Sequence, residues 1–283
     1  MRRSGGGSPS CATGFPVPRW PGWTRCCGGW SCPGSAIRDP DPARAPAGAR
    51  AASHVRTDDR HRNPGRRLPE ACVELWERCR RGELLRQVRV PVRDALSEMA
   101  AGIDSCMFCG NHLGSDIDHF RPKSRFPLRT FDWDNHLLVC AECNRRKGDV
   151  FPGLIDPTTE DPFDHLHLQL ADGRYLALTP KGESTIDILK LNVRRLPEAR
   201  ALARRTMAGL LSCWRSCRDV ADKDGMAAVA ATIREQPFAV VAQAMLRQAV
   251  HPDAELLLRE SPGTLRLLRD KELRATLLTP PPG

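Results

Sequence analysis

Two cysteine pairs constrain this 283-residue chain more than any other feature of its sequence. Cys106 and Cys109 form one Cys-x-x-Cys pair, Cys140 and Cys143 form another, and thirty residues separate the two pairs. Zinc prefers four sulfur ligands in a tetrahedron, and each pair can supply two of them from one tight turn. We therefore predict that these four cysteines bind one structural Zn²⁺, which closes the intervening segment, in preference to four unrelated buried thiols.

The use of cysteine and the distribution of apolar residues favour a reducing compartment. The chain has twelve cysteines, and in a chain of this size regular pairs more often bind metal than form disulfides. No apolar run approaches the about 20 residues of a membrane helix. Gly, Ser and Pro follow the basic start of the chain, where a signal peptide would be apolar. We predict a cytoplasmic protein that does not enter a membrane.

Charge and composition divide the chain into three parts. Residues 1–68 hold twelve Arg, four Asp and no Lys or Glu, which accounts for +8 of the formal charge of +9. They are rich in Gly and Pro without a helix or strand period, so we predict disorder there. A metal knuckle of their Trp and Cys residues, or translation that begins downstream, remain alternatives. Residues 69–195 are predicted to form the domain with the cysteine pairs, and 196–283 a helical C-terminal region.

Local patterns predict helices before the cysteine pairs and a hairpin after them. Residues 69–85 and 92–101 read as two helices, the first opened by Pro69. Residues 165–178 alternate polar and apolar around Asp172-Gly173, which is typical of a β-hairpin with a tight turn.

Two more helices are predicted after the hairpin. Ser184 or Thr185 can cap a short helix that ends at Leu191. Apolar residues from Ala203 to 217 recur at helical spacing, which predicts a long helix with its cysteines at 213 and 217 as packing residues. Strands and helices together predict the α+β class.

The segment between the cysteine pairs predicts strand, loop, strand and helix in that order. A strand ends near Asp118-His119, because Pro122 lacks the backbone donor that regular pairing needs. Neighbours on a strand point to opposite faces, so these two residues can share a site only where the strand becomes irregular. Residues 133–139 form a second strand-like run, and residues 140–147 a short helix that Gly148 ends.

Polar residues in this segment suit the hydrolysis of a phosphodiester. Such a reaction needs a base for water, a cation for the charge on phosphate, and a scaffold for both. His119 suits the base, because the pKa of imidazole lies close to working pH. Asp118 and Asn144 offer hard oxygen ligands for Mg²⁺ or Mn²⁺. Asn135 is expected to orient His119 through a side-chain hydrogen bond.

Basic residues gather around these positions and are candidates for binding nucleic-acid phosphates. We select Arg121, Lys123, Arg145 and Lys147. Lys147 is favoured because it lies one helical turn beyond Asn144. A solvated charged surface is the alternative for each of them.

These residues resemble the HNH endonuclease family in its four-cysteine, ββα-metal form. The three signature positions fall on His119, Asn135 and Asn144, where Asn stands in place of His at the third. Between about residues 92 and 200, segments such as 118–124 and 185–192 also resemble the HNH subunits of Septu-type and retron-associated antiphage systems. The resemblance implies a zinc-stapled ββα module that works beside an ATPase related to the SMC and ABC families.

We therefore predict a metal-dependent HNH endonuclease that cuts DNA, as the nuclease of an antiphage defence system. One alternative is a non-catalytic zinc module that binds nucleic acid or a protein. It accounts for the four cysteines but gives no reason for Asp118-His119 and Asn144. A second alternative is a nuclease of the same type that acts on RNA.

Overall fold

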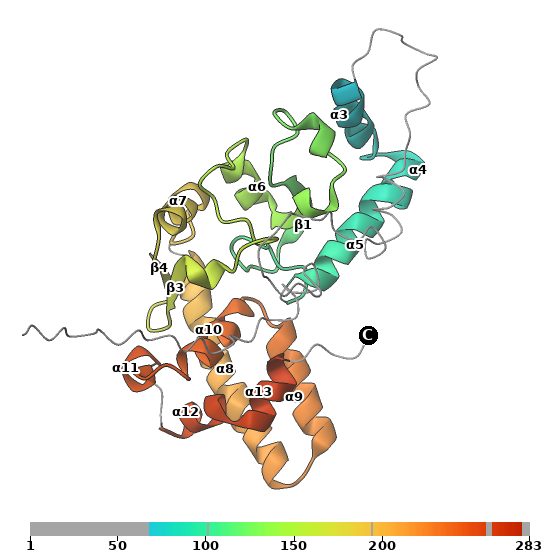
Figure 1. The fold of residues 1–283 in the computed structure, drawn as a ribbon. Helices are drawn as coiled ribbons and strands as arrows, with labels where there is room; N and C mark the ends of the chain where they lie inside the picture. Colours follow the sequence, from blue (N-terminus) through green and yellow to red (C-terminus); the bar gives the residue numbers. More distant parts are fainter. Residues whose placement is uncertain (1–67, 101, 194, 259–261, 279–283) are drawn as a thin grey trace, which may run out of the picture.

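The computed structural model describes residues 68–100, 102–193, 195–258 and 262–278, and Figure 1 shows them as one ribbon in which short strands and many helices are combined. The α+β class predicted from the sequence is confirmed. The disorder and the alternative metal knuckle predicted for residues 1–68 lie outside the described residues, apart from Leu68.

The helices before the first cysteine pair differ from the prediction in where they break. They are α3 (Leu68–Arg78), α4 (Gly82–Leu84), a π-helical turn η4 (Leu85–Arg89) and α5 (Val90–Met99). The first helix ends at Arg78, before residue 85, and the next begins at Gly82, which has a positive φ of 62°, well before residue 92. Pro91 cannot donate a backbone hydrogen bond and its ring needs room, which accounts for the wider turn just before it.

The central ββα unit has the predicted order. β1 (Gly114–His119) pairs antiparallel with β2 (His136–Cys140), and α6 (Ala141–Lys147) follows directly. Short 3₁₀ turns, η5 (Pro127–Arg129) and η6 (Trp133–Asn135), lie in the loop between the strands, so the second strand starts later than residue 133. Gly148, with a φ of 48°, ends α6 as predicted.

The predicted hairpin is also confirmed, but the helix after it starts earlier than expected. A 3₁₀ turn η7 (Pro162–Asp164) precedes β3 (Leu166–Gln169), which pairs with β4 (Arg174–Ala177). The next helix is α7 (Pro180–Leu189), and the Thr179 side chain accepts the capping hydrogen bond from Gly182. Ser184 and Thr185 therefore lie inside this helix and do not cap it, because Thr179-Pro180 supplies a stronger start.

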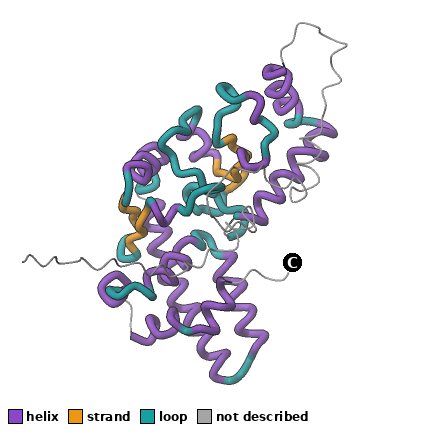
Figure 2. Tube along the Cα trace, viewed as in Figure 1, coloured by secondary structure: helices purple, strands orange, loops and turns teal. Residues whose placement is uncertain are grey.

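The C-terminal part is helical, as predicted (Figures 1 and 2). Its helices are α8 (Arg195–Asp219), α9 (Lys223–Glu235), α10 (Val240–Gln248), α11 (Ala254–Leu258), α12 (Pro262–Arg269) and α13 (Lys271–Leu278). The expected apolar face of α8 buries Met207, Leu211 and Trp214. Cys213, however, is exposed and Cys217 half-buried, because the buried stripe of α8 is narrower than the apolar pattern suggested.

One large hydrophobic core joins the ββα unit to the C-terminal helices. It includes the four paired cysteines together with Leu137 and Val139 of β2 and continues through Met245 to Leu277. A second, smaller core packs α3 and α5 against the opposite face of the strands, through Trp76 and Leu138 among others. The strands are therefore held from both sides.

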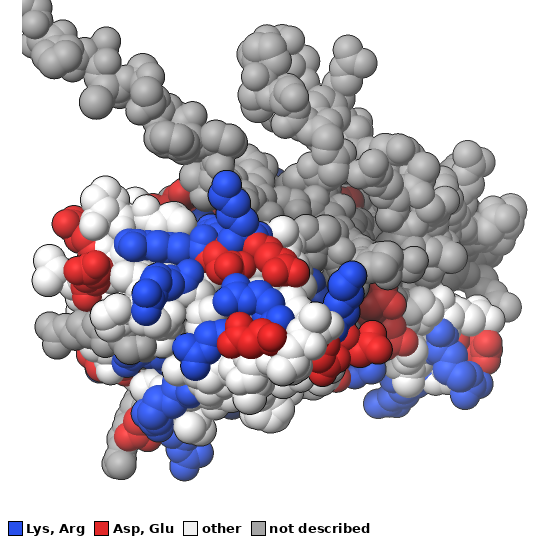
Figure 3. Space-filling view, turned by 90° about the horizontal axis from the view of Figure 1, so that it is seen from below, with Lys and Arg blue, Asp and Glu red and all other residues white. Residues whose placement is uncertain are grey.

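The distribution of charge on the surface and the length and apolar character of the helices are relevant to what this chain contacts. The face seen in Figure 3 carries Lys and Arg side chains interspersed with Asp and Glu, not a patch of one sign. None of the helices that the structure describes combines the length and the apolar character needed to cross a membrane.

Candidate functional site

The four paired cysteines converge as the sequence predicts. Their sulfur atoms all lie within 4.8 Å of one another, and all four residues are buried. The Sγ atoms of Cys109 and Cys140 are 3.9 Å apart, close to the about 3.8 Å edge of a tetrahedron with Zn–S bonds of about 2.3 Å. Hydrogen bonds with Cys106 and the other neighbouring thiols lower the pKa of Cys140 and raise the pKa of Cys109 and Cys143, so the four thiols titrate as one cluster. The residues fit a structural Zn²⁺.

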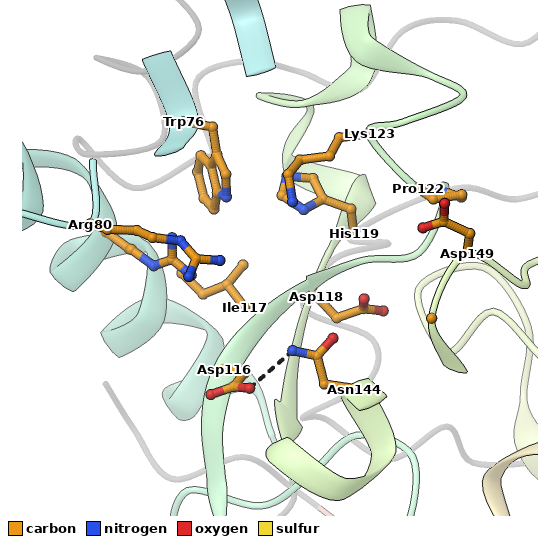
Figure 4. A pocket seen from close by; sticks show the side chains of 12 residues that line it. Trp76, Arg80, Asp116, Ile117, Asp118, His119, Pro122, Lys123, Asn144 and Asp149 are labelled. Atoms are coloured by element: carbon orange, nitrogen blue, oxygen red, sulfur yellow. Dashed lines mark hydrogen bonds between the residues drawn. The ribbon is translucent and has the colours of Figure 1, made fainter. Parts of the chain in front are cut away.

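A second group of polar residues lies between β1 and α6. Asn144 donates a hydrogen bond of 2.9 Å from Nδ2 to Oδ2 of Asp116. In Figure 4 the other end of this amide, Oδ1, points toward the carboxylate of Asp118. The carboxylate of Asp118 is buried, and Nζ of Lys147 contacts both of its oxygen atoms, Oδ1 at 3.3 Å and Oδ2 at 3.0 Å. These oxygen atoms fit a hard divalent cation such as Mg²⁺ or Mn²⁺.

Lys147 is placed differently from the prediction. Its side chain is fully buried, and Nζ lies 3.0 Å from Oδ2 of Asp118 and 2.8 Å from the carbonyl oxygen of His119. A buried ammonium held this way does not reach the surface where a nucleic-acid backbone would lie. The prediction of Lys147 as a direct phosphate contact is therefore wrong, because the helical turn that brings it near Asn144 directs it inward. Burial raises the pKa of Asp118, and Lys147 opposes that shift.

His119 lies against aromatic residues on the other face of β1. Its ring meets Trp76 and His136 at centroid distances of 4.9 and 5.0 Å. Nε2 lies 3.0 Å from the carbonyl oxygen of Thr130, which can only accept, so Nε2 carries the proton and Nδ1 is the unprotonated nitrogen. Burial, and then His136, lower the pKa of His119 to about 2, so the imidazole is neutral at working pH. Nδ1 has no hydrogen-bond partner among the described residues.

Asn135 does not contact His119 as expected. Its Oδ1 accepts a 2.7 Å hydrogen bond from the backbone N–H of Arg121, and its Nδ2 donates to the carbonyl oxygens of Arg121 and Arg129. Asn135 therefore closes the loop between the strands. Its bond to the carbonyl oxygen of Arg129 lies next to Thr130, whose carbonyl oxygen contacts His119.

Both faces of β1 meet at one pocket of about 260 Å³. Figure 4 shows that Asp116, Asp118 and Asn144 lie on one side of it, with Trp76, His119 and Lys123 on the other. Pro122 and Asp149 also line it. β1 ends at His119, so the two opposite faces of the strand can serve one cavity at its end.

Comparison with known proteins agrees with this geometry. Residues 106–150 match the sequence profile of the family described as HNH endonuclease. This segment is an HNH domain. Septu protein PtuB of Bacillus thuringiensis is 31% identical over 111 residues, which cover 36% of this chain and 41% of PtuB. The chain thus spans less than half the length of that relative, and no solved structure matches it.

The other predicted phosphate-binding residues of the HNH domain differ in their surroundings. Arg121 is exposed. Lys123 lines the pocket, where its Nζ pairs with Glu77 at 3.2 Å. Arg145 is exposed on α6 and pairs with Glu142. All three cations are accessible, in contrast to Lys147.

Several residues at the pocket were missed from the sequence. Asp116 could have been found, because it lies two positions before Asp118 and must share a strand face with it. Trp76, Arg80 and Arg89 lie outside the HNH domain and contribute to the pocket only through the packing of α3 and α5. No spacing rule connects them to His119.

Proposed function

We propose that this chain is a metal-dependent nuclease that hydrolyses phosphodiester bonds in DNA. The observation that carries the proposal is the position of His119, which lines the same pocket as Asp118 and Asn144 and whose Nδ1 has no hydrogen-bond partner among the described residues. A scaffold that only bound a partner would need neither the unpaired nitrogen nor the oxygens beside it.

His119 serves as the general base in this proposal. The carbonyl of Thr130 fixes the proton on Nε2, so the lone pair of Nδ1 is available to take a proton from water. Trp76 and His136 pack against the ring and hold its orientation. The proton transfer forms an imidazolium, whose N–H at Nε2 keeps its contact with Thr130.

Asp118 and Asn144 hold the catalytic cation. Asp116 fixes the amide of Asn144 and leaves Oδ1 for the ion, while Lys147 orients the carboxylate of Asp118. A bound Mg²⁺ or Mn²⁺ neutralises the charge that develops on the phosphate. Since Lys147 offsets the charge of Asp118, the protein contributes little net negative charge, and we expect the cation to bind weakly.

The cellular role that we propose rests on a relative of this chain. The likeness to Septu protein PtuB supports a role in a Septu-type antiphage system. The partner proposed on the same ground is an ATPase subunit related to the SMC and ABC families.

The test of catalysis is a His119→Ala variant. We expect it to retain zinc and fold but to lose about 10²–10⁴ of the cleavage rate, the usual effect of a missing general base. His112→Ala is the matched control, since this histidine is exposed and lies in the same domain. Cleavage is measured on DNA and on RNA of the same sequence with added Mg²⁺ or Mn²⁺. Parental activity in His119→Ala would remove the base assignment.

A second variant separates the cation from the base. Asn144→Ala should lose activity through weaker cation binding, so a higher concentration of Mn²⁺ should restore part of the rate. The rate of His119→Ala should not respond in this way. A loss in Asn144→Ala that does not change with metal concentration would argue against Asn144 as a ligand.

A further inference from the structure

Part of the pocket wall comes from the helices that precede the HNH domain. Trp76 lies on α3, Arg80 in the turn after it, and Arg89 at the end of the π-helical turn η4. Together with Lys123 they bring three cations to one side of the cavity. Asp116, Asp118 and Asn144 line the same cavity.

Two of these cations already have a counter-ion. Nε of Arg80 lies 2.8 Å from one carboxylate oxygen of Glu77, and Nζ of Lys123 lies 3.2 Å from the other. Glu77 thus neutralises part of the wall and ties α3 to the loop of the HNH domain.

Arg89 packs against Trp76, but one of its hydrogen-bond donors has no partner among the described residues. Its Cζ lies 5.1 Å from the centroid of the Trp76 ring, a cation–π distance. Its Nη1 is buried and has no hydrogen-bond partner in the part of the chain that the structure describes. A buried guanidinium donor without an acceptor is costly, so such a group indicates a missing anionic or polar partner.

The backbone and the surrounding charges agree with this interpretation. Arg89 is the last residue of the π-helical turn η4, which fixes its position beside Trp76. Burial lowers the pKa of Arg89, and Arg80 lowers it further, while Glu77 and Asp116 oppose the shift. An arginine remains charged in such surroundings, so an anion that enters the pocket gains a fixed cation.

We propose that Arg89 binds the phosphodiester in this pocket, with its guanidinium donating to a non-bridging phosphate oxygen. The inference rests on the proposed function, because the same phosphodiester must reach His119. Trp76 contacts both groups, at 4.9 Å to the ring of His119 and 5.1 Å to the guanidinium. The guanidinium therefore lies at most about 10 Å from the imidazole, so one strand can reach both groups, through the phosphate that His119 serves or through a neighbouring phosphate.

Kinetics of Arg89 variants test the contact in the full chain. Arg89→Gln should lower kcat/KM about 10- to 100-fold, the range for loss of a charge-assisted hydrogen bond. Arg89→Lys should keep part of the rate, because lysine keeps the positive charge but lacks the planar set of N–H donors of a guanidinium. Arg93→Gln is the control: the side chain is 43% exposed on α5 and pairs with Asp94. Parental kinetics in both Arg89 variants would overturn the proposal and leave the nuclease assignment intact.

A binding measurement separates this proposal from catalysis. The chain is labelled with 5-fluorotryptophan, and the ¹⁹F resonance of Trp76 is assigned from a Trp76→Phe variant. A short DNA oligonucleotide and its RNA counterpart are then titrated without added divalent cation. A saturable shift of the Trp76 resonance in the parent and in Arg93→Gln, but not in Arg89→Gln or only at higher concentration in Arg89→Lys, supports the proposal even if the parent cuts neither substrate. An equal shift in the folded Arg89 variants would refute it.

Discussion

The buried ion pair between Asp118 and Lys147 gives a direct test of the site. Their side chains are 8% and 0% exposed, and Nζ also donates to the carbonyl of His119. Lys147→Met keeps the length of the side chain and removes the ammonium. Because the carboxylate of Asp118 would then be buried without its cation, we expect a loss of about 3–5 kcal/mol in the free energy of unfolding.

A double-mutant cycle tests whether the charges of Asp118 and Lys147 are coupled. Asp118→Asn should also destabilise the fold, because it leaves the ammonium of Lys147 without a carboxylate. The double variant should lose less than the sum of the two single losses, since neither charge then remains. Added Mg²⁺ should restore part of the stability of Lys147→Met, where the free carboxylate can bind it, but not of Asp118→Asn.

Urea unfolding at a constant zinc concentration measures these differences. Arg145→Met is the matched control on the same helix, because this side chain is 71% exposed and its loss should change stability by no more than about 0.5 kcal/mol. Additive losses in the double variant, or a Lys147→Met variant as stable as the control, would show that the two groups are not coupled.

Three further predictions concern zinc, the loop and pH. Cys140→Ala should lose stoichiometric zinc and unfold the HNH domain, as measured by metal analysis and thermal melting; a zinc-free variant with parental stability would contradict this. Asn135→Ala removes three hydrogen bonds to the loop backbone, so cleavage should fall while zinc content stays at one ion per chain, and an unchanged cleavage rate would exclude the positioning role. Burial lowers the pKa of His119 to about 2 and of His136 to about 4, from 6.5. The unfolded chain therefore binds more protons below about pH 6.5, and each histidine should cost about 1 kcal/mol of stability between about pH 6.5 and 5.5. His136→Gln should remove about half of that dependence in urea unfolding, and an unchanged slope would count against the burial of its ring.

The order of elements around the site follows from local sequence. Cys-x-x-Cys spacing, Pro122 and Gly148 each act within a few residues, and the structure has the strands, the helix and the sulfur cluster that they predict. The direction of Lys147 does not follow in this way. Helical spacing shows which residues are neighbours on α6, but whether that face meets solvent or β1 depends on tertiary packing.

The residues that α3 and η4 contribute to the pocket were harder still to predict from the sequence. Arg89 approaches His119 because α3 and α5 pack on the strands through Trp76 and Leu138. The sequence predicted helices in this region, yet amphipathic periodicity does not specify which strand face a helix covers. The boundaries were missed for a related reason, since Gly82 and Pro91 reshape the helices where the pattern alone appeared continuous.

The placement of neighbouring residues on opposite faces of β1 has a chemical consequence. If the carboxylate of Asp118 contacted the imidazole of His119, it would raise the pKa of the histidine. Strand geometry prevents this, because Asp118 turns to Lys147 while His119 turns to Trp76 and His136. The cations of Lys123 and Arg89 lower the pKa of His119 further. Cation binding and proton transfer can therefore share one pocket at the end of the strand, while the base stays neutral until water and phosphate arrive.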